Sequence, residues 1–465
     1  MIRRFYILLL AVIGMAGCSL IPDYHRPDSP MTDTFKEDGD WHHAHPADET
    51  KRGEWWVVFR DPLLDQMENQ LETGSLELAA ALARYDAANA FFSGQSARLY
   101  PEINAIGNSN TNRESANRPL RGPGLPNMYG DKAIGVGTLY EIDLWGHIRS
   151  AITSAEALAE ASRQDVESVR LSLQAQLATD YFLLRGTDSQ IRLLEDSVKA
   201  YESELLLMQR RHDEGIVSGL DVARSETLLE ETQALKFKAI AQRAQYEHAI
   251  AALLGQSPST FSIPPQPLVV VYPNVPATIP SQVLQRRPDI SAAERRVAAA
   301  NATVGVARAA FFPEISLGAF GGFQNTGGGA LMTAPNSFWS LGPLAFYNIF
   351  DAGLRQAAVD QTMAQTREAA AVYRQTVLDA FKEVEDSLAL LHYLAEQNNH
   401  ESAAVKAAEH TFDLANNRYR EGAVSYLEVI DAENAKLRTE RVELDIRTAR
   451  MEASVSLIRA IGGAW

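Results

Sequence analysis

The sequence predicts a mainly α-helical protein with a smaller β-strand part, built from two copies of one repeat. The pattern Arg-x-x-Glu-Gly-x-Val-Ser-x-Leu-acid-Val begins at Arg211 and again at Arg418. The same offset of 207 residues relates Gly146 to Gly353. In both copies a long proline-free segment rich in Ala, Leu, Glu, Gln and Arg follows two strand-like segments. Recurrence at one spacing indicates an internal duplication.

The N-terminus is typical of a bacterial lipoprotein precursor. Two arginines, a short apolar run and the small residues Ala16 and Gly17 precede the single cysteine, Cys18. Residues 1–17 are therefore predicted to be a signal peptide. Met-Ala-Gly-Cys resembles a lipobox, which implies that Cys18 becomes acylated and anchors the chain in outer-membrane lipid. We expect residues 18–75 to form a lipidated segment that packs on the helices.

Each repeat is expected to contribute one long helix and one composite helix. The first repeat, residues 76–265, has a short helix over Leu76–Leu99, two strands, a long helix over His147–Asp213 and a return helix of about 35 residues. The second, residues 266–465, repeats this order with helices over Ile290–Ala310 and Leu354–Glu421. A helix of about 67 residues is about 100 Å long, so lateral packing against neighbours is required.

The strand segments alternate large apolar with small or polar residues, a pattern typical of membrane β-barrels. The predicted strand over Lys132–Trp145 has one face formed by Ile134, Val136, Thr138, Tyr140, Ile142 and Leu144. In the second repeat the matching face has Ile315, Leu317, Ala319 and Phe323. An ordinary soluble sheet remains the alternative. The segments Thr111–Asp131 and Gln324–Ser337 are expected to be loops, and Pro343 is expected to mark the bend from strand to helix.

The strand number predicts an oligomer. Four strands per chain cannot close a barrel, and open strand edges are not tolerated in lipid. Three chains supply about twelve strands, an even number suited to antiparallel closure. The fold prediction is therefore a homotrimer with a 12-stranded barrel and an α-helical tunnel.

Composition excludes several functional classes. With 43 basic against 59 acidic side chains, the net charge of −16 argues against a nucleic-acid partner. The ten histidines are scattered and no nucleophile lies near a base in any known motif, so neither an enzyme nor a cofactor is predicted. No metal site is assigned, and metal binding by His42, His43 and His45 is left open. Trp55 and Trp56 are expected to pack against the helices.

The chain resembles the TolC-like outer-membrane efflux proteins, specifically the lipoprotein channel subunits of tripartite RND pumps. The segments that carry this resemblance are CSLIPDYHRP from Cys18, WWVVFRD from Trp55, RPDI from Arg287, FDAG from Phe350 and IGGAW from Ile461. The resemblance implies a trimeric barrel in the bacterial outer membrane and a periplasmic tunnel. It also implies docking to a periplasmic adaptor that links the channel to an inner-membrane RND transporter, where cargo selection is expected to lie.

A periplasmic gate is predicted at the hairpins that contain Gly215 and Gly422. Glu428 and Asp431 lie three residues apart on the helix after Gly422, so both point to one side. Threefold symmetry would turn each acid into a ring that favours cations. The resemblance implies that Asp431 contributes to the constriction and that Tyr419 and Asp221 belong to its closing network. The arginine of that network is replaced by Val424. Alternatively, these acids only solvate or cap a helix start.

Two other functional classes fit the sequence less well. A non-conducting, lipid-anchored periplasmic scaffold or adaptor would have one helical hairpin framed by β-rich halves, whereas this sequence has two hairpins and two strand pairs. An enzyme is the third and weakest possibility.

Overall fold

The structure is a computed structural model and describes residues 19–28, 35–36, 53–117, 122, 124, 126–273 and 286–463. The predicted signal peptide, Cys18 and the three clustered histidines lie outside the described residues. Among the described helices, none has the length and apolar character needed to cross a bilayer.

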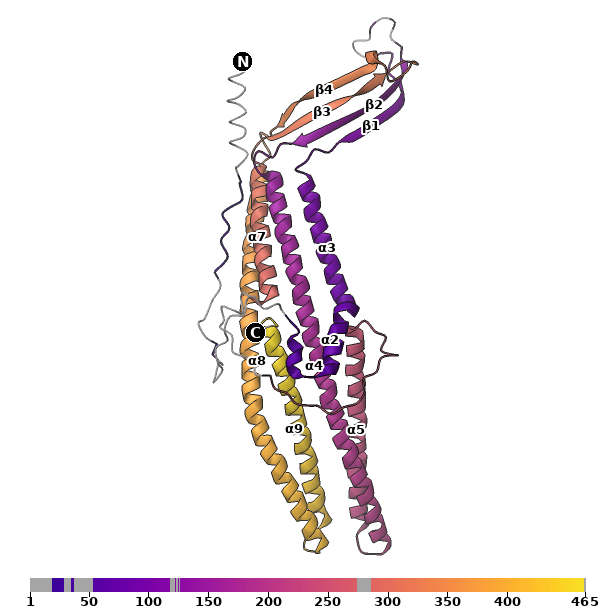
Figure 1. The fold of residues 1–465 in the computed structure, drawn as a ribbon, viewed down its shortest axis with the longest axis vertical. Coiled ribbons are helices and arrows are strands. Elements are labelled where there is room, and N and C mark those ends of the chain that lie inside the picture. Colours follow the sequence, from indigo (N-terminus) through magenta and orange to yellow (C-terminus); the bar gives the residue numbers. More distant parts are fainter. Residues whose placement is uncertain are drawn as a thin grey trace. The chain divides into compact units, whose positions relative to one another are not determined.

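The order of elements is the same in both repeats (Figure 1). The N-terminal part has η1 (Trp55–Phe59) and α2 (Pro62–Gly74). The first repeat then follows as α3 (Leu76–Ala97), β1 (Asn104–Arg113), β2 (Met128–Glu141), α4 (His147–Asp213) and α5 (Gly219–Leu253). The second repeat has α7 (Pro288–Ala309), β3 (Glu314–Asn325), η2 (Ala334–Asn336), β4 (Ser337–Phe346), α8 (Leu354–Arg420) and α9 (Tyr426–Ala460). The predicted mainly helical, duplicated fold is confirmed.

The long helices match their predictions closely. The helices α4 and α8 each contain 67 residues, and the return helices α5 and α9 each contain 35. Neither η1 nor α2 was predicted, although the Asp61-Pro62 pair is a helix-start signal. The Asp61 carboxylate accepts hydrogen bonds from the backbone N–H groups of Leu63 (3.0 Å) and Leu64 (3.3 Å), and proline occupies the first helical position.

The four strands form one antiparallel sheet with the order β1-β2-β3-β4. Because the register pairs Ile134 with Phe323 and Tyr140 with Leu317, the apolar sets predicted for the two repeats lie on the same face. The predicted extent of β2 was wrong at both ends, since the strand starts at Met128 and stops at Glu141.

Asp143 explains where β2 ends, and Pro343 has a place that differs from the prediction. After β2 the Asp143 carboxylate accepts hydrogen bonds from the backbone of Ile148 (3.1 Å) and Arg149 (2.9 Å), which caps α4 and ends the extended chain. The prediction for Pro343 was also wrong. It lies inside β4, opposite Leu317, and not at the bend to α8. β4 is an edge strand, where a missing N–H donor is tolerated.

The chain divides into two compact units. The first comprises residues up to Pro27, Arg84–Ser162 and Ala292–Tyr373, and contains the sheet. The second comprises Asp28–Ala83, Arg163–Ser291 and the part from Arg374 onwards, and contains α5, α9 and the parts of α4 and α8 that lead into them.

In the second unit, η1 and α2 pack on α4. The ring of Phe59 lies 4.8 Å from that of Phe182, and both side chains are buried. Further along α4, Gly186 lets α9 approach, since a Cβ atom there would lie only 2.3 Å from the Oγ1 atom of Thr448. The single glycine of this helix therefore marks a close contact between the two repeats.

Candidate functional site

The two helical hairpins end in tips of nearly identical backbone. Gly215 and Gly422 adopt φ angles of 72° and 74°, in the left-handed region that favours glycine. The backbone N–H of Ile216 donates to the carbonyl oxygen of Arg211 at 2.8 Å, and that of Ala423 donates to Arg418 at the same distance. Both long helices therefore end in the same hydrogen-bonded turn. We call residues 211–224 tip 1 and residues 418–431 tip 2.

The caps of the return helices differ. In tip 1 the Ser218 hydroxyl accepts from the backbone N–H of Asp221 at 3.3 Å, and the Asp221 carboxylate accepts from the Ser218 backbone at 3.3 Å. This is a complete capping box. In tip 2 Ser425 is the N-cap of α9 but its side chain makes no capping hydrogen bond.

The four predicted gate residues take different positions. Glu428 and Asp431 are both exposed on α9. Asp221 is partly buried by its capping interactions and lies 3.7 Å from the Arg224 guanidinium. Tyr419 accepts a hydrogen bond from Arg211 at 3.4 Å and contacts the Met208 sulfur at 3.7 Å.

Tyr419 belongs to a cluster that joins the tips. Its ring centroid lies 5.4 Å from that of Tyr426, which is 2% exposed. Met208, Val429 and Ile430 complete the buried part of the cluster. The hydroxyl of Tyr426 lies 2.7 Å from that of Ser225 on α5. Side chains from both repeats therefore hold the two tips together.

Sequence reasoning missed a buried acidic group behind tip 2. Glu433 is 7% exposed, and burial together with the charge of Glu204 on α4 raises its pKa to about 8. A sequence signal for it exists, because Tyr426, Ile430, Glu433 and Leu437 follow one helix face at spacings of three and four residues. An acid thus occupies a position in an otherwise apolar stripe.

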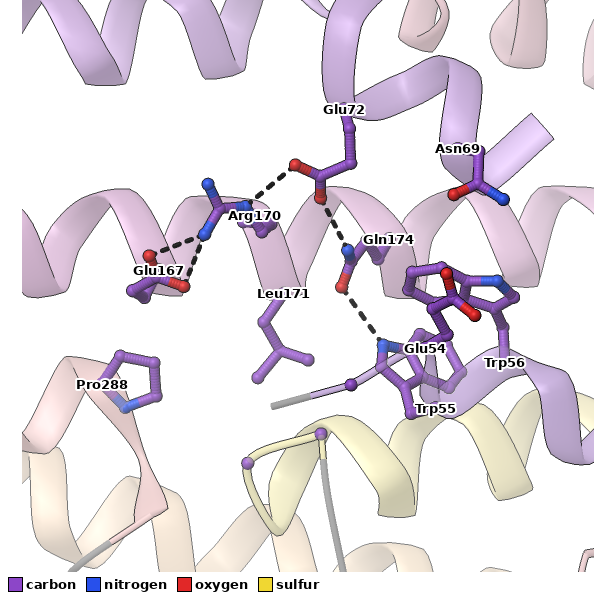
Figure 2. A pocket seen from close by; sticks show the side chains of 13 residues that line it. Glu54, Trp55, Trp56, Asn69, Glu72, Glu167, Arg170, Leu171, Gln174 and Pro288 are labelled. Atoms are coloured by element: carbon purple, nitrogen blue, oxygen red, sulfur yellow. Dashed lines mark hydrogen bonds and ion pairs between the residues drawn. The ribbon is translucent and has the colours of Figure 1, made fainter. Parts of the chain in front are cut away.

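A pocket of 320 Å³ lies where η1 and α2 meet α4 (Figure 2). The Arg170 guanidinium lies 3.1 Å from the Glu72 carboxylate, which also accepts a hydrogen bond from Gln174 at 2.9 Å. The Gln174 side-chain oxygen in turn accepts from the Trp55 indole at 3.2 Å. Trp55 and Trp56 are both buried, as expected of packing residues. This chain of contacts attaches the N-terminal segment to α4.

Comparison with known proteins identifies the family. Residues 68–256 and 279–463 match the outer membrane efflux protein family. The chain belongs to this family. It is 32% identical over 464 residues to the probable efflux pump outer membrane protein TtgC of Pseudomonas putida strain KT2440, covering 99% of this chain and 96% of that one. It is 30% identical over 460 residues to the pyoverdine export outer membrane protein OpmQ of Pseudomonas aeruginosa, covering 97% and 96%.

A solved structure agrees with these relatives. The outer-membrane channel OprN superposes with a TM-score of 0.86 at 30% identity, covering 96% of this chain and all of that one. The predicted resemblance is therefore confirmed, and so are the outer-membrane location and the function as an efflux channel. The family and its relatives are channel proteins and not enzymes. In the described part of this efflux protein, no group of three or more His, Cys, Asp or Glu side chains is placed to hold a metal ion.

Proposed function

We propose that three copies of this efflux protein form a closed exit duct, with a 12-stranded barrel in the outer membrane and a helical tunnel in the periplasm. The observation that carries this proposal is the open sheet, in which β1 and β4 are unpaired edges. On β4, Trp339 is 81% and Leu341 65% exposed. Joining β4 of one copy to β1 of the next satisfies the edges, and lipid covers the apolar face.

The partners and processing follow from the same assignment. The duct docks on a periplasmic adaptor, receives small molecules from an inner-membrane RND transporter and is anchored through acylated Cys18. The proposed division of the chain is a signal peptide over 1–17, a lipidated segment over 18–75, and repeats over 76–265 and 266–465.

Mass spectrometry of the membrane-extracted protein tests the anchor. An N-terminal peptide that begins at acylated Cys18 is expected, and an unmodified cysteine there would contradict the proposal.

The gate is proposed to lie at tip 2, where charge differs from tip 1. Glu428 and Asp431 are exposed acids, whereas the equivalent positions in tip 1 are Asp221 and Arg224, which pair at 3.7 Å. Threefold repetition of tip 2 gives two anionic rings, while tip 1 gives rings of compensated charge. Cation preference is therefore expected to depend on tip 2.

Planar-bilayer recording of the purified mature protein tests both channel and gate. The Glu428→Gln, Asp431→Asn double variant is expected to lose cation selectivity. The matched control is Asp221→Asn, Arg224→Gln, which removes one acid and one base and is expected to keep it. Equal selectivity in both variants would place the gate elsewhere. Absence of conductance from a well-folded wild-type trimer would favour the lipid-anchored scaffold instead.

A further inference from the structure

An acid-rich interface joins the two repeats behind the tips. The helices α4 and α9 run antiparallel, because Gly186 contacts Thr448, whereas Glu204, nearer the tip in α4, meets Glu433, nearer the tip in α9. Between these two contacts the Gln190 amide donates a hydrogen bond to Asp445. We call this contact, from Gly186 to Glu204 on α4 and from Glu433 to Thr448 on α9, the α4–α9 seam.

Glu433 lies at the tip end of the seam in apolar surroundings. On one side are Tyr201 and Leu437, which belong to one buried cluster, and on the other are Tyr426 and Ile430, which belong to the next. One carboxyl oxygen of Glu433 is fully buried without a hydrogen-bond partner, while the group hydrogen bonds with Glu204. Glu204 is only partly buried and also hydrogen bonds with the Tyr426 hydroxyl, which favours its charged form. Charge is therefore favoured on Glu204 and a proton on the more deeply buried Glu433, where it is shared between the two carboxyl groups.

The surrounding groups do not supply a stronger counter-ion. The titratable groups that face the pair or its immediate neighbours are Tyr201 on α4, Tyr426, Lys436 and Glu440 on α9, and Glu409 on α8; α5 contributes the neutral hydroxyl of Ser225. The Lys436 ammonium lies 3.9 Å from Glu440 and 5.3 Å from the Phe412 ring centroid. The charge of Lys436 is thus shared between Glu433 and the partly buried Glu440. A pocket of 270 Å³ adjoins Glu433, but no metal-binding group of three side chains is found among the described residues.

We propose that Glu204 and Glu433 share one proton, and that this proton holds α4 against α9 behind the two tips. Loss of the proton leaves two carboxylates in contact in an apolar site, so the seam loosens and the tips separate more easily. We call this shared proton and the two carboxyl groups that hold it the latch. The latch is a property of the α4–α9 seam within one chain. Its consequence for conduction rests on the proposed function.

The direction of the pH effect follows from burial. Burial and the neighbouring acid raise the pKa of Glu433, so the folded seam keeps a proton that the unfolded chain has already released. The seam is therefore fully stable below the ordinary carboxyl range and loses stability as the pH rises from there through about 8. A carboxylate in a salt bridge behaves in the opposite way, because it stabilises the folded state more as the pH rises.

Hydrogen exchange of the full-length protein tests the latch directly. After correction for intrinsic exchange, amides of residues 426–440 are expected to open about a hundredfold more often at about pH 9 than at about pH 6, because a folded pKa of about 8 gives about two pKa units of linkage over this range. Glu433→Gln keeps the shape of the side chain without a titrating proton, so its opening is expected to be independent of pH. The control Glu202→Gln, at an exposed position of α4, is expected to retain the wild-type response.

Each outcome decides the proposal. Equal protection of the wild type at both pH values, or an unchanged pH response in Glu433→Gln, would overturn it. If Glu433→Gln fails to fold, Glu204→Gln serves instead and is also expected to remove the pH response. Conductance recorded over the same range separates the two proposals. An exchange response without any conductance supports the latch and contradicts the channel, whereas conductance without the exchange response contradicts the latch alone.

Discussion

The helices α4 and α8 have the same length and descend from one repeat, yet their surroundings differ. Gly186 of α4 corresponds to Tyr393 of α8. Thr448 covers Gly186, whereas Tyr393 is 63% exposed. Likewise, position 219 of tip 1 is glycine, and its counterpart in tip 2 is the buried Tyr426. Duplication has thus preserved the backbone while the side chains of each copy adapted to the other copy. Stability within one chain depends on contacts between repeats, so equivalent substitutions should have unequal effects.

The largest expected difference is at Tyr426. Tyr426→Ala removes a buried aromatic ring that contacts Tyr419 and packs on side chains of tip 1. It should lower the local opening free energy of α9 by about 3 kcal/mol. Gly219→Ala, at the equivalent position, should have no destabilising effect, because the new Cβ would lie 3.6 Å from the His212 ring. Hydrogen exchange of the two tips measures both, and comparable losses would contradict the inequality of the repeats.

The next largest difference is between the two long helices. Gly186→Leu forces a side chain into the space of Thr448 and should destabilise the α4–α9 seam by about 2 kcal/mol. Tyr393→Leu should change stability by less than about 0.5 kcal/mol. Thermal unfolding of the purified protein compares the two variants. A loss of stability in Tyr393→Leu as large as that in Gly186→Leu would show that α8 is covered as tightly as α4.

The caps provide a smaller test. Ser218→Ala removes a capping box and should cost about 1 kcal/mol at the start of α5. Ser425→Ala removes a side chain that makes no capping hydrogen bond and should cost less than about 0.5 kcal/mol at the start of α9. Exchange rates of the first-turn amides in each helix report the difference. If Ser425→Ala destabilises the first turn of α9 more than Ser218→Ala destabilises that of α5, then Ser425 and not Ser218 makes the stronger cap.

The smallest expected effect on stability comes from charge. Arg224→Asp makes tip 1 resemble tip 2, because it removes the ion pair between Arg224 and Asp221. That ion pair contributes no more than about 0.5 kcal/mol to stability. The effect of the substitution on selectivity should be larger, because it leaves Asp221 uncompensated and places a second acid at position 224, which adds two anionic rings on the tip 1 side of the proposed gate. Reversal-potential measurements in a salt gradient should therefore show stronger cation preference. Unchanged preference would mean that Arg224 does not face the conducting path.

The sequence predicted the helices better than their contacts. The bounds of α4 were predictable because a proline-free run of helix formers ends in a Glu-Gly turn. The first residues of β2 were not, since Gly130 and Asp131 resemble loop residues and join the strand only through pairing with β1. The apolar stripe around Glu433 indicates a buried position, but its acidic partner could not be assigned, because Glu204 lies on α4, more than 200 residues away in the chain. For the predicted gate residues, sequence supplied charge and spacing but not their interactions.

The proline in β4 affects the exposed edge of the sheet in a chain that has not yet assembled. Before assembly, both outer strands of the sheet expose unsatisfied backbone groups that can recruit any extended peptide. Pro343 removes one donor from the middle of β4, so indiscriminate strand addition cannot run uninterrupted along that strand. The residue that was expected to mark the bend from strand to helix therefore leaves a gap in the backbone donors of the strand that the proposed trimer pairs with β1 of the next copy.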